Sequence, residues 1–236
     1  MSAHAIDGQF FDIACRFYAD GSLYLPDNRT LILSDLHLGK GAAQRMTSPM
    51  PGYDTDDTLN RLEAAIMRTD PSQTILLGDS FHSPEQAEML PAYHLDHIMQ
   101  IARQTDLVWI EGNHDPSLPH RLPGQSCSYL TLGSLLLCHQ PAYQAEQPER
   151  PVTGQIIGHY HPKARLQLKA RNLSAKCFIH DHSLMILPAF GAFTGGLNIL
   201  HDEIQTLLGR GQQSYVLHQQ SIYHFPVSRR HFRQSV

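Results

Sequence analysis

The chain has 236 residues, of which 42% are hydrophobic and 17% charged, and its formal net charge is -4. This length and apolar content suit one large domain and exclude bulk disorder. The negative charge excludes nucleic-acid binding through overall charge, so that any such contact would need a local basic patch.

The first half of the chain alternates strand and helix patterns. A hairpin is expected around residues 19–22, and the apolar run at 30–33 predicts a strand. Leu59, Leu62 and Ile66 recur at helical spacing and predict a helix through Arg68. A strand at 74–77, a second helix around 95–101 and a third strand at 107–110 follow.

Short strand patterns dominate the second half. They lie at 129–132, 134–138, 155–157, 177–179 and 184–187, with a closing hairpin from 215–217 and 222–225. Strand–helix alternation followed by strands predicts the α/β (α+β) class, with a mixed sheet facing a second sheet and helices outside. We expect a single domain over residues 1–236, with 226–236 as a flexible basic tail.

The cysteines indicate the redox compartment, and histidine is unusually frequent. The cysteines at 15, 127, 138 and 177 form no C-x-x-C pair, which favours a reducing compartment over a disulfide framework. No secretory signal pattern or run of transmembrane length is present, so that a soluble cytoplasmic protein with no membrane association is expected. Histidine is abundant, with 16 residues against 18 lysines and arginines combined.

Polar groups follow five of the apolar strands. In open α/β sheets, loops beyond the carboxyl ends of strands converge on one edge, where sequence-distant groups become neighbours. Seven candidate metal ligands stand at such ends: Asp35, His37, Asp79, Asn113, His139, His159 and His161.

The D-x-H and H-x-H spacings suit metal binding. Alternate residues of an extended segment point the same way, roughly 6–7 Å apart, so that both side chains can reach one cation. This donor set is too large for one tetrahedral ion and suits two ions sharing a carboxylate, for which Asp79 is the natural choice. Oxygen and imidazole donors without thiolate favour Mn, Fe, Zn or Co. The alternative, ordinary turn residues at strand ends, explains each position alone but not the ordered set.

The ordered blocks resemble the calcineurin-like metallophosphoesterase superfamily. They are Asp35-Leu36-His37, Gly78-Asp79, Gly112-Asn113-His114-Asp115, His139 and Gly158-His159-Tyr160-His161. The segments SDLHLGKGAAQRM, LLGDSFH and LPAFGAFTGGL are further similar to the ligase-associated DNA-damage-response endonucleases of the PdeM type.

The superfamily resemblance implies a four-layer αββα sandwich of two mixed β-sheets flanked by helices, with two divalent metal ions, Mn foremost. It also implies that one ion is held by Asp35, His37, Asp79 and His161, and the other by Asp79, Asn113, His139 and His159.

His114 and Asp115 are the candidate catalytic residues. His114 diverges from its neighbour Asn113 on an extended chain, so that it is suited to protonating the leaving oxygen. Asp115 could orient that ring, or Asp115-Pro116 could begin a helix as N-cap and first residue. Both interpretations stay open.

Several basic residues are candidates for substrate binding. Lys163, Arg165, Lys169 and Arg171 alternate on one face of a strand predicted over 163–171, which could receive a nucleic-acid backbone or be a solvated strand face. Lys40, Arg45 and His82 could meet a phosphate or be plain loop residues. His180-Asp181-His182 has ligand spacing but lies between two short strands, and we expect a hairpin turn there.

The sequence thus predicts a metal-dependent phosphodiesterase. The family resemblance implies DNA as the substrate, endonuclease activity in DNA repair, and a DNA ligase or helicase assembly as partner. One alternative keeps the chemistry on a nucleotide or another small phosphoester. Another is a non-catalytic interaction module, against which the intact Asp35, Asp79, Asn113 and His114 argue.

Overall fold

The computed structural model describes residues 4–40, 53–141, 152–168, 171–192, 194–228 and 232. Two of the candidate residues, Arg45 and Lys169, lie outside these ranges. The helices in the described ranges are too short or too polar to span a lipid bilayer.

The first sheet has seven strands arranged in chain order. Four antiparallel strands form its first part: β1 (Ala5–Phe10), β2 (Ile13–Tyr18), β3 (Leu23–Leu25) and, after the 3-10 turn η1 (Pro26–Asn28), β4 (Thr30–Leu33). Three strands then continue parallel to β4: β5 (Gln73–Leu77), β6 (Asp106–Ile110) and β7 (Gln125–Cys127).

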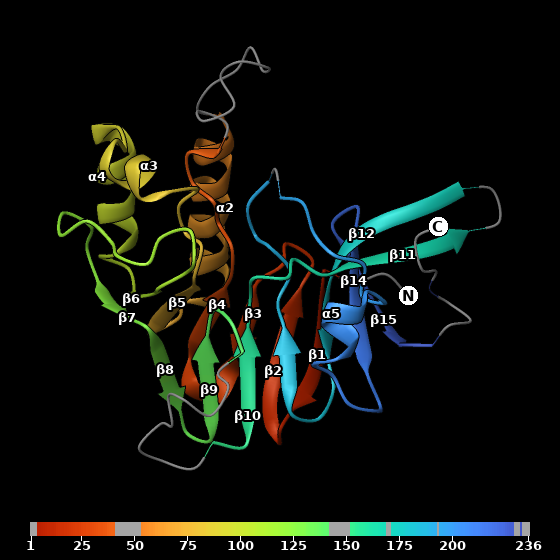
Figure 1. Ribbon diagram of the computed structural model, residues 1–236. Coiled ribbons are helices and arrows are strands. Elements are labelled where there is room, and N and C mark those ends of the chain that lie inside the picture. The colour runs from red at the N-terminus through yellow and green to blue at the C-terminus, as the bar shows by residue number, and fades with distance from the viewer. Residues whose placement is uncertain are drawn as a thin grey trace.

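The second sheet is also mixed, with the order β15-β14-β12-β13-β10-β9-β8. Its strands are β8 (Tyr129–Leu132), β9 (Leu135–Cys138), β10 (Gly154–Ile157), β12 (Arg171–His180), β13 (Leu184–Ile186), β14 (Gln213–His218) and β15 (Ser221–Pro226). β11 (Lys163–Leu168) pairs with the first half of β12, and this hairpin extends beyond the body of the sheets (Figure 1).

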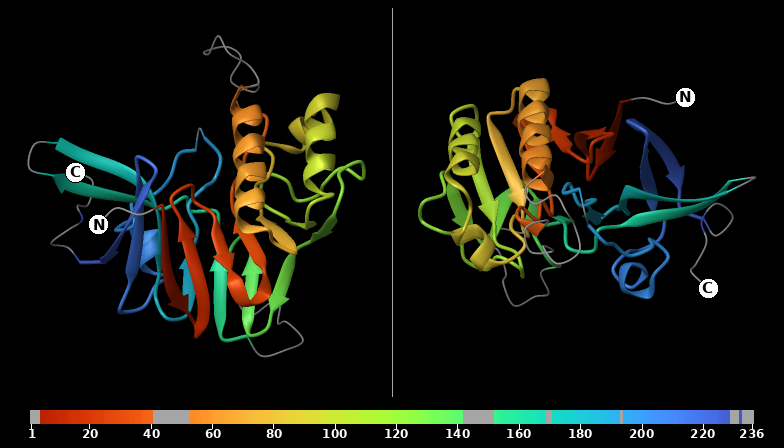
Figure 2. Two further views of the ribbon diagram at one scale, coloured as in Figure 1. Left: turned by 180° about the vertical axis from the view of Figure 1, so that it is seen from behind. Right: turned by 90° about the horizontal axis from the view of Figure 1, so that it is seen from above.

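Three apolar clusters hold the sheets and helices together. Figure 2 shows how these sheets and helices are arranged. Phe17, Ile75 and Phe178 belong to the core between the sheets. The outer face of the first sheet packs against α2 (Tyr53–Thr69), α3 (Pro84–Glu88) and α4 (Ala92–Ile101). The outer face of the second sheet packs against a segment that includes the single-turn helix α5 (Asp202–Gln205) and against Phe232. The predicted architecture of two mixed sheets flanked by helices is therefore confirmed, although its fourth layer is thin.

Two local predictions are wrong. The single strand expected over 163–171 is interrupted, because β11 ends at Leu168 and Arg171 begins β12 directly opposite it. No helix begins at Pro116, since residues 111–124, all within a described range, are irregular. The predicted turn at His180-Asp181-His182 is confirmed, and the Asp181 carboxylate accepts the backbone N–H groups of Ser183 and Leu184.

The carboxyl ends of five strands meet at one edge of the sandwich. β4, β5 and β6 are parallel neighbours in the first sheet, and β9 and β10 in the second. Backbone hydrogen bonds join their ends: the N–H groups of Asp35 and His37 donate to the carbonyl oxygens of Gly78 and Asp79 at 3.1 and 2.9 Å. This edge carries all the candidate metal ligands.

Candidate metal centre

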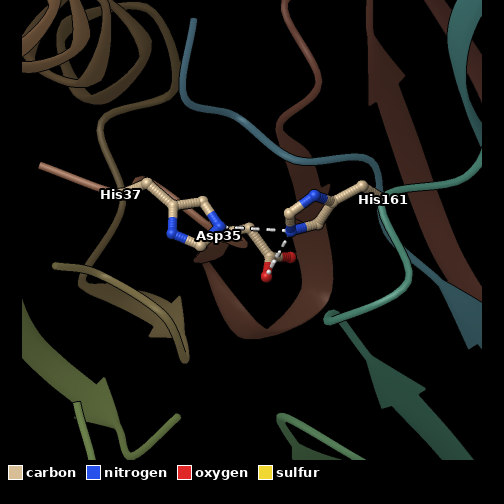
Figure 3. A group of neighbouring side chains, drawn as sticks. All are labelled: Asp35, His37 and His161. Carbon is tan, nitrogen blue, oxygen red and sulfur yellow. Dashed lines mark hydrogen bonds and ion pairs between the residues drawn. The ribbon is translucent and has the colours of Figure 1, made fainter. Parts of the chain in front are cut away.

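The first group of donors comprises Asp35 and His37, which follow β4, and His161, which follows β10. His161 Nε2 lies 3.0 Å from Asp35 Oδ1 and 3.2 Å from His37 Nε2. Figure 3 shows the two imidazole rings and the carboxylate turned toward one another. One ligand atom from each residue lies within 4.8 Å of the others, which is compact enough for a single metal ion.

The second group comprises Asp79 after β5, His139 after β9 and His159 after β10. Their ligand atoms also lie within 4.8 Å of one another. His139 Nε2 is 3.3 Å from Asp79 Oδ2 and 3.1 Å from the amide oxygen of Asn113. The structure therefore divides His159 and His161 between two groups and places Asn113 beside the second.

Left-handed backbone conformations bring these side chains together. Asp35, His37, Asp79, His159 and His161 all have φ between 45° and 68°. Non-glycine residues rarely adopt this region, and such strain clusters at functional sites. Asp35 and His37 of the D-x-H pair thus meet through left-handed loop residues rather than along an extended strand. The two histidines of the H-x-H pair lie in different donor groups, contrary to the prediction that both reach one cation.

Two glycines allow the close approach. A Cβ at Gly78, which has φ +75°, would collide with the His139 ring. A Cβ at Gly158 would collide with Ser34 Oγ and with the Asp35 carboxylate. Steric crowding therefore explains why glycine precedes the ligand in the Gly-Asp and Gly-His blocks.

Burial and mutual charge set the protonation of the donors. Burial lowers the pKa of His37 to about 4, so that its ring is neutral at pH 7. Burial opposes ionisation of Asp79, but the hydrogen bond and charge of His139 outweigh it and lower the pKa to about 2. For Asp35, contacts with His161 likewise outweigh burial and lower the pKa. Burial lowers the pKa of His139 less than Asp79 and Asp35 raise it, so that the net shift is upward.

The donors fit divalent metal ions. His37 Nδ1 is buried without a hydrogen-bond partner, although its Nε2 faces His161. His139 Nδ1 lies 3.1 Å from the carbonyl oxygen of Leu77, an arrangement that leaves Nε2 as the ligating atom. The two groups, made of imidazole and carboxylate alone, fit a dinuclear centre.

His114 and His82 lie beside the first donor group, with ring centroids 5.4 and 6.4 Å from that of His37. Their rings stack at 5.9 Å, and His114 Nδ1 is 3.1 Å from the carbonyl oxygen of His82. His114 Nε2 lies 4.0 Å from Asp79 Oδ2, and its side chain is 44% exposed. His82, expected as a loop or substrate-facing residue, thus supports the His114 ring.

The Asp115 side chain contacts the backbone rather than the His114 ring. Its two carboxylate oxygens accept the backbone N–H groups of Phe81 and Gly112, at 3.0 and 3.1 Å. The side chain is fully buried and tethers the loop after β6 to the loop after β5. The carbonyl oxygen of His82, not Asp115, contacts the His114 ring nitrogen.

The basic candidates have different environments. Lys40 follows the Asp35-x-His37 pair in the sequence. Burial is the largest cause of the lowered pKa of His37 and of His82, and the charge of Lys40 also lowers both pKa values. Lys163 Nζ donates to the carbonyl oxygen of Thr194 at 3.1 Å and is half-buried, whereas Arg165 on the same face of β11 is exposed.

Two polar residues at the site were not predicted. Ser34 Oγ hydrogen-bonds to the Asp35 carboxylate, and Gln140 Nε2 lies 3.2 Å from His159 Nε2. Each directly adjoins a predicted ligand in the sequence, and this adjacency is the signal that could have found them.

Comparison with known proteins adds one informative likeness. No protein-family profile and no curated protein sequence matches the chain. The solved structure of Pseudomonas putida nuclease MPE matches with a TM-score of 0.71 and 27% identity, over 94% of this chain and all of that one. The phosphoesterase Yfce from E. coli (16% identity, TM-score 0.43) matches 84% of this chain and 99% of its own. A predicted phosphoesterase from Streptococcus pneumoniae (12%, 0.33) matches 84% and 97%.

The fold, the two donor groups and the likeness to nuclease MPE identify the class. The chain is a metal-dependent phosphoesterase with the calcineurin-like fold. Within that class its structure is similar to that of nuclease MPE.

Proposed function

We propose that this phosphoesterase is a phosphodiesterase acting on DNA, an endonuclease linked to DNA repair, with Mn as its native ion. The observation that carries the proposal is the likeness to a nuclease over 94% of the chain, combined with a two-group donor set at one sheet edge. The PdeM-type segments support the link to repair and an association with a DNA ligase or helicase assembly.

Each of the two donor groups would hold one of the two proposed ions. One ion would be held by Asp35, His37 and His161, and the other by Asn113, His139 and His159. Asp79 would be shared, because it lies within its own group while its charge also acts on the His37 ring. When bound, the two ions would activate a water molecule and neutralise the phosphoryl oxygens.

His114 would donate a proton to the leaving oxygen. The His82 carbonyl oxygen holds the Nδ1 side of the ring, which leaves Nε2 directed at the metal centre. The exposure of this side chain allows a substrate to reach it. Asp115 would act indirectly, by fixing the backbone from which His114 projects.

The proposed DNA contacts are those predicted from the sequence: Lys40, Arg45, His82, Lys163, Arg165, Lys169 and Arg171. The evidence for a DNA contact differs from residue to residue. Lys40 and His82 lie beside the donors, and Arg165 is an exposed cation on the projecting hairpin. Arg45 and Lys169 rest on the sequence alone.

A substrate panel tests the function. Mn-loaded protein is assayed on a chromogenic phosphodiester, the matching phosphomonoester, and single-stranded, nicked and duplex DNA. Hydrolysis of the diester and of at least one internal DNA bond is expected. Turnover of small diesters or nucleotides with no DNA form cleaved would contradict the substrate. No turnover with any substrate would favour a non-catalytic module.

A further inference from the structure

A cavity lies at the same edge of the sandwich as the metal centre. Its volume is about 730 Å³. It is lined by residues from the end of β2 and the following turn, from α2 and β12, and from the turn between β14 and β15. Three cations line it: Arg61, Arg68 and Lys176. Among the described lining residues, Asp20 is the carboxylate that faces them.

Aromatic rings and Asp20 hold the two arginines in place. The Arg68 guanidinium lies 4.0 Å above the Tyr18 ring and 2.7 Å from Asp20 Oδ2. The Arg61 guanidinium lies 4.3 Å above the Phe190 ring and donates to the Asp20 carbonyl oxygen at 3.1 Å. Stacked guanidinium groups are fixed in orientation before a ligand arrives, so that less freedom is lost when they bind an anion.

Arg61 also forms a weak ion pair with a carboxylate outside the cavity. Asp57, one helical turn earlier on α2, is 3.7 Å from it and 57% exposed, and such surface pairs contribute little. The cavity therefore keeps an excess of positive charge.

Lys176 supplies a third, half-buried positive charge. Its ammonium group donates to the carbonyl oxygens of Ala189 and Gly191 at 2.7 and 2.5 Å, and it forms no ion pair within the described part of the chain. Burial, followed by the like charges of Arg61 and Lys163, lowers its pKa to about 7. An anion in the cavity would neutralise this positive potential.

One backbone segment connects Lys176 of the cavity with the metal centre. The N–H groups of Phe190 and Gly191 donate to the carbonyl oxygens of Ser34 and Asp35 at 2.7 and 3.0 Å. The segment 189–191 thus contacts Lys176 through its carbonyl oxygens and the first donor group through its N–H groups.

Positive charge continues between the two sites. The charges of Lys40 and Lys163 both act on Lys176, and Lys163 follows His161 by two residues. One strand of nucleic acid laid along this edge would meet cations on its way from the metal centre to the cavity.

We propose that this cavity binds a backbone phosphate of the substrate strand, at a nucleotide away from the bond hydrolysed at the metal centre. The inference rests on the proposed function, because it assigns a second contact to the same polynucleotide. It makes the cavity a determinant of preference for polymers over small diesters.

The test compares Lys176→Met with Lys176→Arg, which keeps the charge. Arg68→Gln removes a charge at the cavity and leaves Lys176 in place, so that it provides the test if Lys176→Met fails to fold. Arg103→Gln is the matched control, because Arg103 is an exposed residue just after α4, near the start of β6 and so at the opposite edge of the sheet.

Each variant is assayed with Mn on an oligonucleotide and on a chromogenic diester. Binding of a fluorescent oligonucleotide is also measured in EDTA over a range of salt concentrations. Lys176→Met and Arg68→Gln are expected to raise the oligonucleotide KM roughly tenfold. The slope of log affinity against log salt should fall by about 0.7. Turnover of the small diester stays unchanged, and Lys176→Arg and Arg103→Gln behave as wild type.

Three results would overturn the proposal. They are an unchanged oligonucleotide KM and salt slope, an equal loss on the small diester, or inorganic phosphate or a mononucleotide binding as tightly as the strand. Strand binding in EDTA that depends on Lys176, in a protein that cleaves no DNA, would support the cavity while removing the proposed nuclease function.

Discussion

At the scale of single residues, His114 is held at one ring nitrogen and open at the other. The contact of Nδ1 with the His82 carbonyl oxygen and the exposure of the side chain suit proton transfer to a leaving group. We expect His114→Gln to lower kcat roughly 10²- to 10⁴-fold on a diester with an alkoxide leaving group. The loss should be much smaller with a nitrophenolate, which departs without a proton.

Steady-state kinetics on the two diesters measures this difference, and the metal content of the variant is the control. Equal losses on both leaving groups, or loss of bound metal, would show that His114 has another role.

The half-buried ammonium group of Lys176 predicts a pH dependence of stability. Its pKa in the folded chain is about 7, against an ordinary value of 10.5. Between these values the unfolded chain binds a proton that the folded chain does not, so the Lys176 contribution to the free energy of unfolding rises with pH. Lys176→Met should show a shallower rise over this interval in urea denaturation. Parallel curves for the variant and wild type would contradict the burial of this charge.

The sequence could predict which residues gather at the site, but not how. Asp35, His37, Asp79, His139, His159 and His161 are recognisable because each follows an apolar strand. All but His139 are left-handed, and these conformations depend on hydrogen bonds between loops far apart in the chain, which no local spacing reveals. For the same reason the partners of Asp115 were unpredictable.

At the scale of the elements, the ends of β4 and β10 pack so closely that only glycine fits at 158. A methyl group there would collide with Ser34 and Asp35. Gly158→Ala should lower the free energy of unfolding by about 1–3 kcal/mol and weaken metal binding. Gly195→Ala is the control, because a Cβ there has nothing within 4 Å.

Denaturant unfolding and Mn titration of both variants test the close approach. If the two variants lose the same stability, or neither loses any, the packing at the end of β10 is looser than described.

Elements with strong periodicity could be predicted, and those without could not. Buried strands such as β4, β5 and β6 are continuous apolar runs, and α2 has apolar residues at helical spacing. β7 is a three-residue strand of QSC with little burial, so its sequence carries no signal. The alternation of basic residues continues past Leu168, and it therefore hides the reversal between β11 and β12.

At the scale of the whole molecule, both sheets contribute donors to each metal group. The first group joins the ends of β4 and β10, and the second joins β5 to β9 and β10. Metal ions bound there would link the two sheets and stabilise the folded chain. A free ion concentration of 100 times Kd would add about 2.7 kcal/mol. Thermal unfolding should therefore shift upward on Mn addition, and an unchanged melting temperature would argue against ions at the sheet junction.

The most direct measurement is a Mn titration of metal-depleted protein, followed in parallel by bound metal per chain and by turnover of a chromogenic phosphodiester. Two ions per chain should bind, and turnover should appear with them. Asp79→Asn, which weakens the shared carboxylate, should bind fewer ions and lose turnover. Hydrolysis by the metal-depleted protein, or wild-type binding and turnover in Asp79→Asn, would contradict the two-metal centre.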